Sequence, residues 1–480
     1  MFKSRIRDDN EKTNNEILFI TYIFAAVFVA LICYIVYFTA FKSDGVINNA
    51  YNLKRGEILE EKTVRGTIIS GDGQVLAKTV TKEDGSEVRE YPYANVFAHA
   101  VGFMARGCIG IESMTNYTLL NCSDFFAEKI GNDMHGIKNK GDNVITTLDT
   151  SLQTTASQAL GDRKGAVVLM DVKTGYILAL VSKPDFDPNN IDEIWDSVNN
   201  DTENSPLLNR ATQGLYPPGS TFKIITALEY IRENKDASSY EFDCTGHFEY
   251  DGVKINCYHG QDHGHMDLGL SFAKSCNSSF ANISSGLDKG KFGNTCNELL
   301  FNGKMPCPFS YKQSTVDLNS DSDSADLIQT GIGQGKTQIT PIHMAMITSA
   351  VANGGILMEP MVIDEIRNSG GVVVKDIKIR EYGRLMSEDE SAKVRELMRG
   401  VILNGTGSRL QGTVGYDAAG KTGSAEYSKD KTKSHAWFAG FAPYDDPQVA
   451  ITVIVEGGGS GGETAVPIAR KVFDDYFNGK

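Results

Sequence analysis

The chain reads Tyr216-Pro217-Pro218-Gly219-Ser220-Thr221-Phe222-Lys223 and continues directly into the apolar run Ile224-Ile225-Thr226-Ala227-Leu228. The run predicts a helix over residues 223–233, and Ser220 and Lys223 would then lie one turn apart on the same face. A neutral lysine amine placed there could take the proton of the serine hydroxyl. The Pro-Pro-Gly entry leaves Ser220 near the first helical turn, where unpaired N–H groups favour a developing oxyanion. The stretch therefore predicts an activated serine nucleophile.

The Ser-x-x-Lys spacing is not specific by itself. Roughly two matches are expected by chance in a chain of this length, and Ser271–Lys274 and Ser428–Lys431 also fit. Ser428 lies in a polar stretch that reads as an exposed loop. Ser271 is predicted to lie on the preceding turn of the helix that presents Ser275 and Asn277. Sequence context therefore has to decide between the three candidates.

Two later motifs supply what a nucleophilic serine needs, which is a base, a group that shuttles the proton, and donors for the oxyanion. Ser275-Cys276-Asn277 and then Lys421-Thr422-Gly423-Ser424 follow Ser220. The ordered set Ser-x-x-Lys, Ser-x-Asn and Lys-Thr-Gly is the signature of penicillin-recognising serine transferases and hydrolases. Second copies of the last two motifs, at 197–199 and 173–175, precede Ser220, and the copy at 173–175 reads as a hairpin turn.

Composition sets further limits. The 480 residues are 41% hydrophobic, which is enough for folded domains with real cores. The net charge of −14 and the pI near 5.1 argue against nucleic-acid binding, since no basic stripe interrupts the sequence.

Residues 17–41 contain no charged side chain and form a near-continuous apolar run. About 20 such residues span a bilayer, and the run is longer than a signal-peptide core and lacks a clear cleavage site. We expect an uncleaved transmembrane anchor at 17–41. Residues 1–16 would be a cytoplasmic tail, and the bulk of the chain would be exported as part of a single-pass cell-membrane protein.

Two folded units are expected beyond the anchor. Residues 42–150 contain short strand-like pieces and a polar loop at 81–89, and they read as a small β-rich pedestal or dimerisation-like domain. Residues 151–480 begin and end with strand patterns, and helical patterns lie between them. The expected fold is α+β: a mainly antiparallel sheet flanked by helices, with an inserted helical subdomain.

Several further segments carry a family resemblance. They are Arg65-Gly66-Thr67-Ile68, Gly110-Ile111-Glu112, Gly165-Ala166-Val167-Val168, Asp185-Phe186-Asp187-Pro188-Asn189, Gly333-Gln334-Gly335 with Thr340-Pro341, and Gly420-Lys421-Thr422-Gly423-Ser424-Ala425-Glu426 with His435-Ala436-Trp437-Phe438. With the three motifs, they make nearly everything after the anchor resemble a class B penicillin-binding protein, a peptidoglycan D,D-transpeptidase. Ser424 stands where the family more often has threonine, and a hydroxyl is kept.

The resemblance implies the roles of the site residues. Ser220 would attack a D-Ala-D-Ala stem peptide with Lys223 as its base, while Ser275 and Asn277 relay the proton and hold the donor peptide. Lys421 would position the substrate carboxylate with help from Thr422, Gly423 and Ser424. β-Lactams would acylate the same serine. Catalysis would need no cofactor, and a separate membrane-embedded glycan polymerase is expected as a partner.

A cluster of cysteine and histidine residues precedes Ser275. Cys244, Cys257, His259 and His263 could form a tetrahedral zinc site. The family often has a cysteine and a His-Gly pair here without metal, so a structural zinc, free thiols and disulfides all stay open.

Three functions share the motifs. A D,D-carboxypeptidase or a β-lactamase would release the acyl group to water, and a β-lactam sensor or scaffold would keep it. The anchor and the pedestal favour the transpeptidase over a secreted hydrolase. A sensor would need a signalling region on the cytoplasmic side, where only residues 1–16 are expected.

Overall fold

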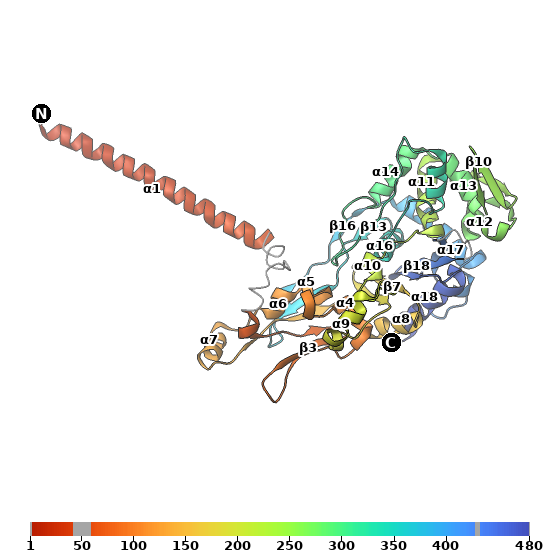
Figure 1. The fold of residues 1–480 in the computed structure, drawn as a ribbon. Coiled ribbons are helices and arrows are strands. Elements are labelled where there is room, and N and C mark those ends of the chain that lie inside the picture. The colour runs from red at the N-terminus through yellow and green to blue at the C-terminus, as the bar shows by residue number, and fades with distance from the viewer. Residues whose placement is uncertain (1, 42–58, 428–432, 480) are drawn as a thin grey trace.

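A computed structural model describes residues 2–41, 59–427 and 433–479 (Figure 1). Helix α1 (Phe2–Phe41) contains the exposed segment Ile17–Phe38, whose mean hydropathy is 2.6. Within the described ranges, it is the one helix long and apolar enough to cross a membrane. The expected anchor at 17–41 thus lies on a continuous helix, and residues 2–16 of the expected tail extend it.

The unit that follows α1 is built on a six-stranded sheet. In spatial order its strands are β15 (Val373–Asp376), β14 (Ile363–Arg367), β6 (Asn143–Thr146), β2 (Ile68–Ile69), β3 (Val75–Thr81) and β4 (Glu87–Glu90). β14 and β15 lie far beyond residue 150, and β14 pairs antiparallel with β6. The sheet therefore draws on both units expected from the sequence.

The polar loop expected at 81–89 is largely wrong. β3 and β4 pair antiparallel from Lys78 with Glu90 to Thr81 with Glu87, so only residues 82–86 form the turn. Polar side chains are compatible with β4 because it is the edge strand of the sheet and three of its four residues are exposed.

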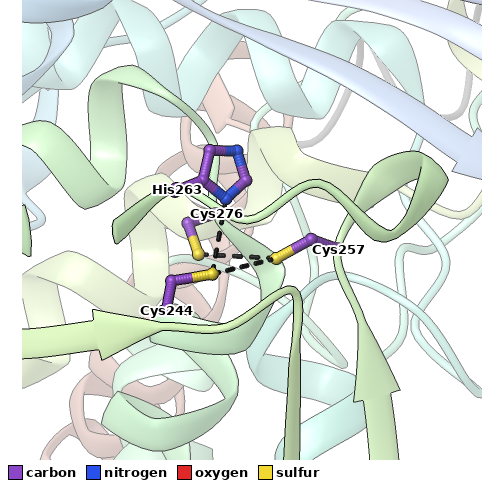
Figure 2. A group of neighbouring side chains, drawn as sticks. All are labelled: Cys244, Cys257, His263 and Cys276. Carbon is purple, nitrogen blue, oxygen red and sulfur yellow. Dashed lines mark hydrogen bonds between the residues drawn. The ribbon is translucent and has the colours of Figure 1, made fainter. Parts of the chain in front are cut away.

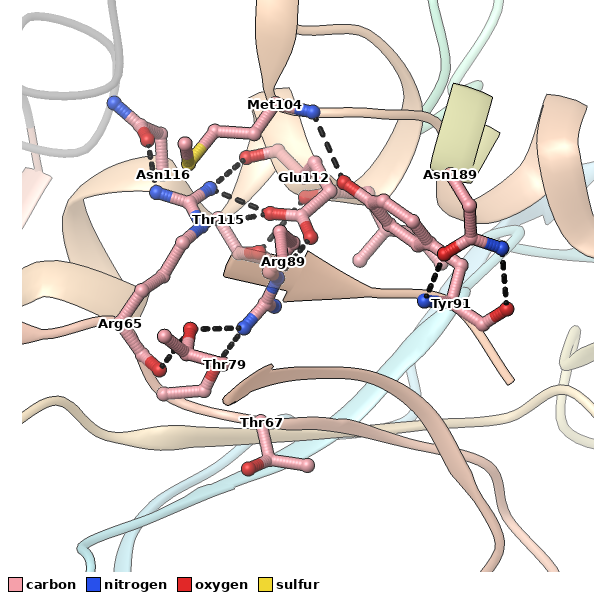
Figure 3. A network of polar contacts seen from close by, with 12 residues as sticks. Arg65, Thr67, Thr79, Arg89, Tyr91, Met104, Glu112, Thr115, Asn116 and Asn189 are labelled. Carbon is pink, nitrogen blue, oxygen red and sulfur yellow. Dashed lines mark hydrogen bonds and ion pairs between the residues drawn. The ribbon is translucent and has the colours of Figure 1, made fainter. Parts of the chain in front are cut away.

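A buried ion cluster holds this unit together (Figure 3). The carboxylate of Glu112 is fully buried and pairs with Arg65 at 2.6 Å and with Arg89 at 2.7 Å. Burial alone would raise the pKa of Glu112, but the two guanidinium groups outweigh it and hold that pKa below its usual value. The cluster ties the segment before β2 and strand β4 to helix α5. The short elements around it are β1 (Thr63–Val64) and β5 (Asn139–Lys140), which pair in parallel, and α4 (Ala98–Val101), α5 (Gly110–Met114), α6 (Asn116–Leu120) and α7 (Phe126–Met134).

The second sheet has five strands, all antiparallel. Their order is β17 (Ala419–Glu426), β18 (Ser434–Ala442), β19 (Val449–Val455), β7 (Gly165–Asp171) and β8 (Ile177–Lys183). β7 and β8 come from the start of the unit and the other three from its end. The expected sheet built from both ends is thus confirmed, and β17 forms one edge.

Helices cover both faces of this sheet. The principal ones are α8 (Thr150–Leu160), α16 (Pro341–Ala352), α17 (Glu388–Asn404) and α18 (Gly461–Asn478). On β7, Val168 and Met170 belong to the core that contains α16, whereas Val167 and Leu169 belong to the core that contains α8 and α18. Alternate residues of one strand therefore enter two different cores, which explains why β7 is apolar almost throughout.

The segment between β8 and β17 carries the inserted helical subdomain. Its helices before α16 are α9 (Ile191–Asn200), α10 (Arg210–Gln213), α11 (Lys223–Glu233), α12 (Leu268–Ala273), α13 (Asn277–Ser285), α14 (Lys289–Glu298) and α15 (Ser324–Gly331). Short strand pairs accompany them: β9 (Glu241–Cys244) with β12 (Gly264–Asp267), β10 (His247–Tyr250) with β11 (Val253–Asn256), and β13 (Ile356–Met358) with β16 (Glu381–Arg384). The α+β prediction with a helical insertion is confirmed.

Candidate active site

Ser220 lies in a 3-10 turn, Gly219–Phe222, and Lys223 is the first residue of α11. The turn is tied from both sides, since the Gly219 N–H donates to the Gly333 carbonyl at 2.8 Å and the Trp437 indole donates to the Pro217 carbonyl at 3.1 Å. Gly219 has φ +53°, and a Cβ there would meet that of Ala425 at 2.9 Å. The glycine of the Pro-Pro-Gly entry thus allows β17 to pack directly against the nucleophile.

Ser275 lies between two helices, whereas the sequence had suggested that it lies on one. α12 ends at Ala273 and α13 begins at Asn277, and Ser275 has a φ of +57°. Cys276 is the N-cap of α13, and its sulfur accepts the Ser279 N–H at 3.3 Å. A left-handed backbone is costly at a serine, and such strained residues are enriched at functional sites.

The amine of Lys223 is buried and has defined acceptors. It donates to the Ser275 carbonyl and to Asn277 Oδ1, both at 2.8 Å, and Ser275 Oγ lies 3.4 Å away. Burial lowers the pKa of Lys223 to about 8, although the nearby Cys276 and Cys257 oppose the shift. A neutral amine has two N–H groups, and these two acceptors leave its lone pair free to receive a proton.

Lys421 reaches the same serine from the sheet. Its amine is fully buried and donates to Ser275 Oγ at 2.8 Å and to the Thr422 carbonyl at 3.1 Å. Burial, and then the charge of Lys223, hold the pKa of Lys421 well below its usual value. The three motifs therefore meet at the hydroxyl of Ser275.

A cleft of about 1450 Å³ opens over these groups, and Ser220, Asn277 and Ser424 line it. Thr422 and Gly423 are buried behind the wall, and the hydroxyl of Thr422 is hydrogen-bonded to that of Thr406. The structure thus brings the expected residues Ser220, Lys223, Ser275, Asn277, Lys421 and Ser424 together, whereas Thr422 and Gly423, expected to bind substrate, do not line the cleft. The cleft is also lined by residues outside the three motifs, which come from other elements: Asn256 at the end of β11, Tyr258, Gln329 on α15, and Gln334 of the Gly333-Gln334-Gly335 segment.

The alternative motif copies among the described residues lie outside this cleft. Ser271 is fully buried on α12, and its hydroxyl accepts a hydrogen bond from Ser279. Lys173-Thr174-Gly175 forms the turn between β7 and β8, as expected. Ser428 and Lys431 lie outside the described residues.

The ligand atoms of Cys244, Cys257, His263 and Cys276 gather within 4.8 Å of one another (Figure 2). The expected set therefore needs one correction. His259 is exposed, adopts φ +53° and packs its ring on Tyr258, whereas Cys276 of the Ser-x-Asn motif completes the group.

Comparisons with known proteins agree with this geometry. Residues 165–474 match the family model of the penicillin binding protein transpeptidase domain, and residues 65–144 match that of the penicillin binding protein A dimerisation domain. The peptidoglycan D,D-transpeptidase PbpA of Mycolicibacterium smegmatis is 32% identical over 90% of this chain and 92% of its own. PbpA of Mycobacterium tuberculosis is 32% identical over 92% of this chain and 94% of its own.

Solved structures show the same fold. Penicillin-binding protein A from M. tuberculosis, as its ceftriaxone acyl-enzyme complex, superimposes with a TM-score of 0.79 and 31% identity over 87% of this chain and 99% of that one. The D,D-transpeptidase domain of a peptidoglycan glycosyltransferase from Eggerthella lenta gives 0.78 and 29% over 86% and 98%. The chain belongs to the penicillin-binding protein transpeptidase family.

Proposed function

We propose that the protein is a serine D,D-transpeptidase that cross-links peptidoglycan stem peptides and is inhibited by β-lactams. The observation that carries the proposal is the convergence of two buried amines, those of Lys223 and Lys421, on the hydroxyl of Ser275 beside the cleft that Ser220 lines. The similarity to curated D,D-transpeptidases and to β-lactam acyl-enzymes supports it.

Acylation begins with neutral Lys223. Its lone pair takes the proton of Ser220 Oγ, and the oxygen attacks the carbonyl carbon of the penultimate D-Ala of a stem peptide. The negative charge that forms on the carbonyl oxygen is stabilised by the backbone N–H groups of Ser220 and Ser424, which both line the cleft. The C–N bond to the terminal D-Ala then breaks.

The leaving amine needs a proton, and Ser275 is placed to deliver it. Its hydroxyl passes a proton to the amine and regains one from the Lys223 ammonium, so D-Ala leaves neutral at nitrogen and the acyl group stays on Ser220. An amine of a neighbouring stem peptide then attacks the ester. Its proton returns through the same groups, an amide forms, and the Ser220 hydroxyl is restored.

Strand β17 would position the substrate. The strand is the edge of its sheet, so an extended stem peptide can lie along it and pair with its free backbone groups. Lys421 and Ser424 then hold the terminal carboxylate. Thr422 is hydrogen-bonded to Thr406 behind the wall, and Gly423 keeps the strand close to the nucleophile turn, where an added Cβ would lie 3.1 Å from the Pro218 carbonyl oxygen.

The membrane segment sets where the reaction takes place. With α1 in the membrane, the protein is a single-pass cell-membrane protein, and its two sheets belong on the extracytoplasmic side, where stem peptides are exposed. The family models match a dimerisation domain and a transpeptidase domain over residues 65–474. The glycan strands would therefore come from a separate membrane-embedded polymerase.

Intact mass measured after incubation with penicillin G tests the nucleophile. The full-length protein in detergent is expected to gain one penicillin, Ser220→Ala none, and Ser197→Ala as much as wild type. Ser197 is the matched control because it lies in the earlier Ser-x-Asn copy, exposed on α9. An adduct that persists in Ser220→Ala would overturn the site assignment.

Product analysis with stem pentapeptide separates the enzymes that share this site. With an amine acceptor present, the transpeptidase forms the cross-linked peptide and releases D-Ala in equal amount. A tetrapeptide acid as the main product would show a carboxypeptidase. Rapid hydrolysis of the penicillin adduct would show a β-lactamase, and a stable adduct without any peptide turnover would show a sensor.

A further inference from the structure

The side chains of Cys244, Cys257, His263 and Cys276 form a cluster that has no role in the catalytic steps above (Figure 2). The sulfur of Cys257 lies 3.7 Å from that of Cys244 and 3.6 Å from that of Cys276, and Nδ1 of His263 lies 3.5 Å from the sulfur of Cys244. The three thiols are buried, and His263 is half-buried.

The spacing of these atoms fits a tetrahedral metal. Zinc binds thiolates at about 2.3 Å and imidazole at about 2.0 Å, which in a tetrahedral site places sulfurs about 3.8 Å apart and sulfur about 3.5 Å from nitrogen. Three of the six distances between the ligand atoms, 3.7, 3.6 and 3.5 Å, fall close to these values, and all six are within 4.8 Å. Three thiolates and one imidazole form a closed structural zinc set, and such soft ligands disfavour calcium and magnesium.

Two backbone N–H groups donate hydrogen bonds to sulfurs of the cluster, which would stabilise the deprotonated thiolate form. The Gly246 N–H donates to the sulfur of Cys244 at 3.4 Å, and the Ser279 N–H donates to the sulfur of Cys276 at 3.3 Å. Hydrogen bonds of this kind commonly orient and stabilise the ligands of a metal site.

The local fold has a small core of its own, although Phe242 and Ile255 also pack against the main core. Residues 241–267 form four short strands in two pairs, and their buried apolar side chains are those of Cys244, Cys257 and Met266. With Cys276 and the half-buried Phe242 they make a small core separate from the two main ones. Segments of this size usually need a metal or a disulfide to hold their shape.

The cluster is connected directly to the catalytic groups. Cys276 stands between Ser275 and Asn277, and Cys257 follows Asn256, whose carbonyl accepts the Asn277 amide at 3.3 Å. A metal bound to Cys257 and Cys276 would fix the positions of the neighbouring Asn256 and Asn277, and so the hydrogen bond between them. Asn277 in turn accepts from Lys223 at 2.8 Å, and residues 254–260 form one wall of the cleft.

We propose that Cys244, Cys257, His263 and Cys276 bind one zinc ion, and that this zinc positions Ser275 and Asn277 for the acylation of Ser220. The metal site stands on its own geometry, whereas its effect on acylation rests on the function proposed above. Asn277 and the wall at 254–260 hold their places only while the four ligands share the metal, so the zinc is a positioning element and takes no part in the chemistry.

Zinc content tests the ligand set. The full-length protein, purified in detergent with reductant, is expected to hold about one zinc per chain. Cys276→Ser and His263→Ala should lose it. His259→Ala and the control His265→Ala, an exposed histidine of β12 that pairs with Asp243, should keep it. Serine can still cap α13 at position 276, so loss of zinc from that variant would reflect the missing thiolate.

Cobalt substitution gives a second reading that does not depend on the variants. Co²⁺ in the wild-type site should show the intense visible bands of tetrahedral coordination and the ultraviolet charge-transfer bands of cobalt–thiolate bonds. Octahedral spectra, less than about 0.1 zinc per chain with all thiols free, or a disulfide among the three cysteines would each overturn the site. Loss of zinc from His259→Ala with retention in Cys276→Ser would overturn the ligand set.

Removal and return of zinc tests the positioning role. A zinc chelator, followed by desalting, should slow the acylation of Ser220 by a fluorescent penicillin about 10-fold or more, and added zinc should restore the rate. An unchanged rate in zinc-free protein would overturn the positioning role. A protein that holds zinc but never forms the adduct would instead overturn the proposed function and leave the metal site standing.

Discussion

The amine of Lys421 donates a hydrogen bond to the hydroxyl of Ser275 across 2.8 Å, although 146 residues separate them. Lys223 approaches the same hydroxyl at 3.4 Å from α11. Two amines thus share one oxygen, and because burial lowers the pKa of both, protons can move among these groups near neutral pH.

Acylation should depend on pH through Lys223. The base is active when neutral, and its pKa is lowered to about 8, so the acylation rate should rise about tenfold per pH unit below that value and level off above it. Stopped-flow measurement with a chromogenic cephalosporin checks this. A flat profile in the wild type between about pH 6 and 9 would contradict the assignment of Lys223 as base.

Replacing Ser275 by alanine removes the oxygen that the two amines share. We expect acylation by penicillin to slow about 100-fold or more, the usual cost of losing a positioned proton donor. Ser285→Ala, at the end of α13, is the matched control, because that hydroxyl donates to the nearby Asn282 carbonyl. Gel fluorescence with labelled penicillin gives both rates, and equal rates in the two variants would remove Ser275 from the proton path.

Gly333 supports the nucleophile turn. It has φ +73°, and a Cβ there would lie 2.0 Å from the Gly219 carbonyl oxygen, beside the hydrogen bond between these two residues. Gly333→Ala should therefore displace Ser220 and slow acylation about 100-fold. Gly252→Ala is the control, since φ is +75° there but nothing lies within 4 Å. It should cost only about 1 kcal/mol of stability and leave acylation unchanged.

Glu112→Gln should destabilise the unit built on the six-stranded sheet by about 3 kcal/mol at pH 7, because Arg65 and Arg89 lose their buried counter-charge. Glu90→Gln, which breaks a surface pair with Lys78, should change stability by less than about 0.5 kcal/mol. Urea denaturation followed by circular dichroism measures both.

The same pair of variants has a pH signature. The pKa of Glu112 is lowered on folding, so its stabilisation is present above the unfolded value near 4.5 and is lost as pH falls through the folded pKa. The gap between wild type and Glu112→Gln should therefore be widest at neutral pH and should narrow below about pH 4.5. A gap that stays constant into acid would show that the carboxylate charge is not what stabilises the cluster.

Local sequence patterns predicted the helices and strands whose apolar residues form a clear run or repeat. The apolar run after Lys223 predicted both ends of α11, and the strand patterns expected at the start and end of residues 151–480 include β7 and β19. The order of the three motifs, together with the Pro-Pro-Gly entry, predicted Ser220 as the nucleophile among the three Ser-x-x-Lys matches.

Other features depend on contacts that no local pattern encodes. Cys276 was assigned to the Ser-x-Asn motif alone, and only the approach of Cys257 shows that its side chain also faces the cluster. His259 was expected there from spacing, but a turn with positive φ directs the chain away. β14 carries no sign in its sequence that it pairs with β6, because pairing across such a separation is decided by the assembled sheet.

The pairing of β14 with β6 also imposes an order on biosynthesis. In the extracytoplasmic topology proposed above, residues 63–146 would leave the cell first, and β6 would have no strand on one side until the chain has been exported beyond Arg367. Exposed strand sides invite pairing with other chains. The amino-terminal half would therefore need a chaperone, or close tethering by its own anchor, during the interval in which the catalytic half is still crossing the membrane.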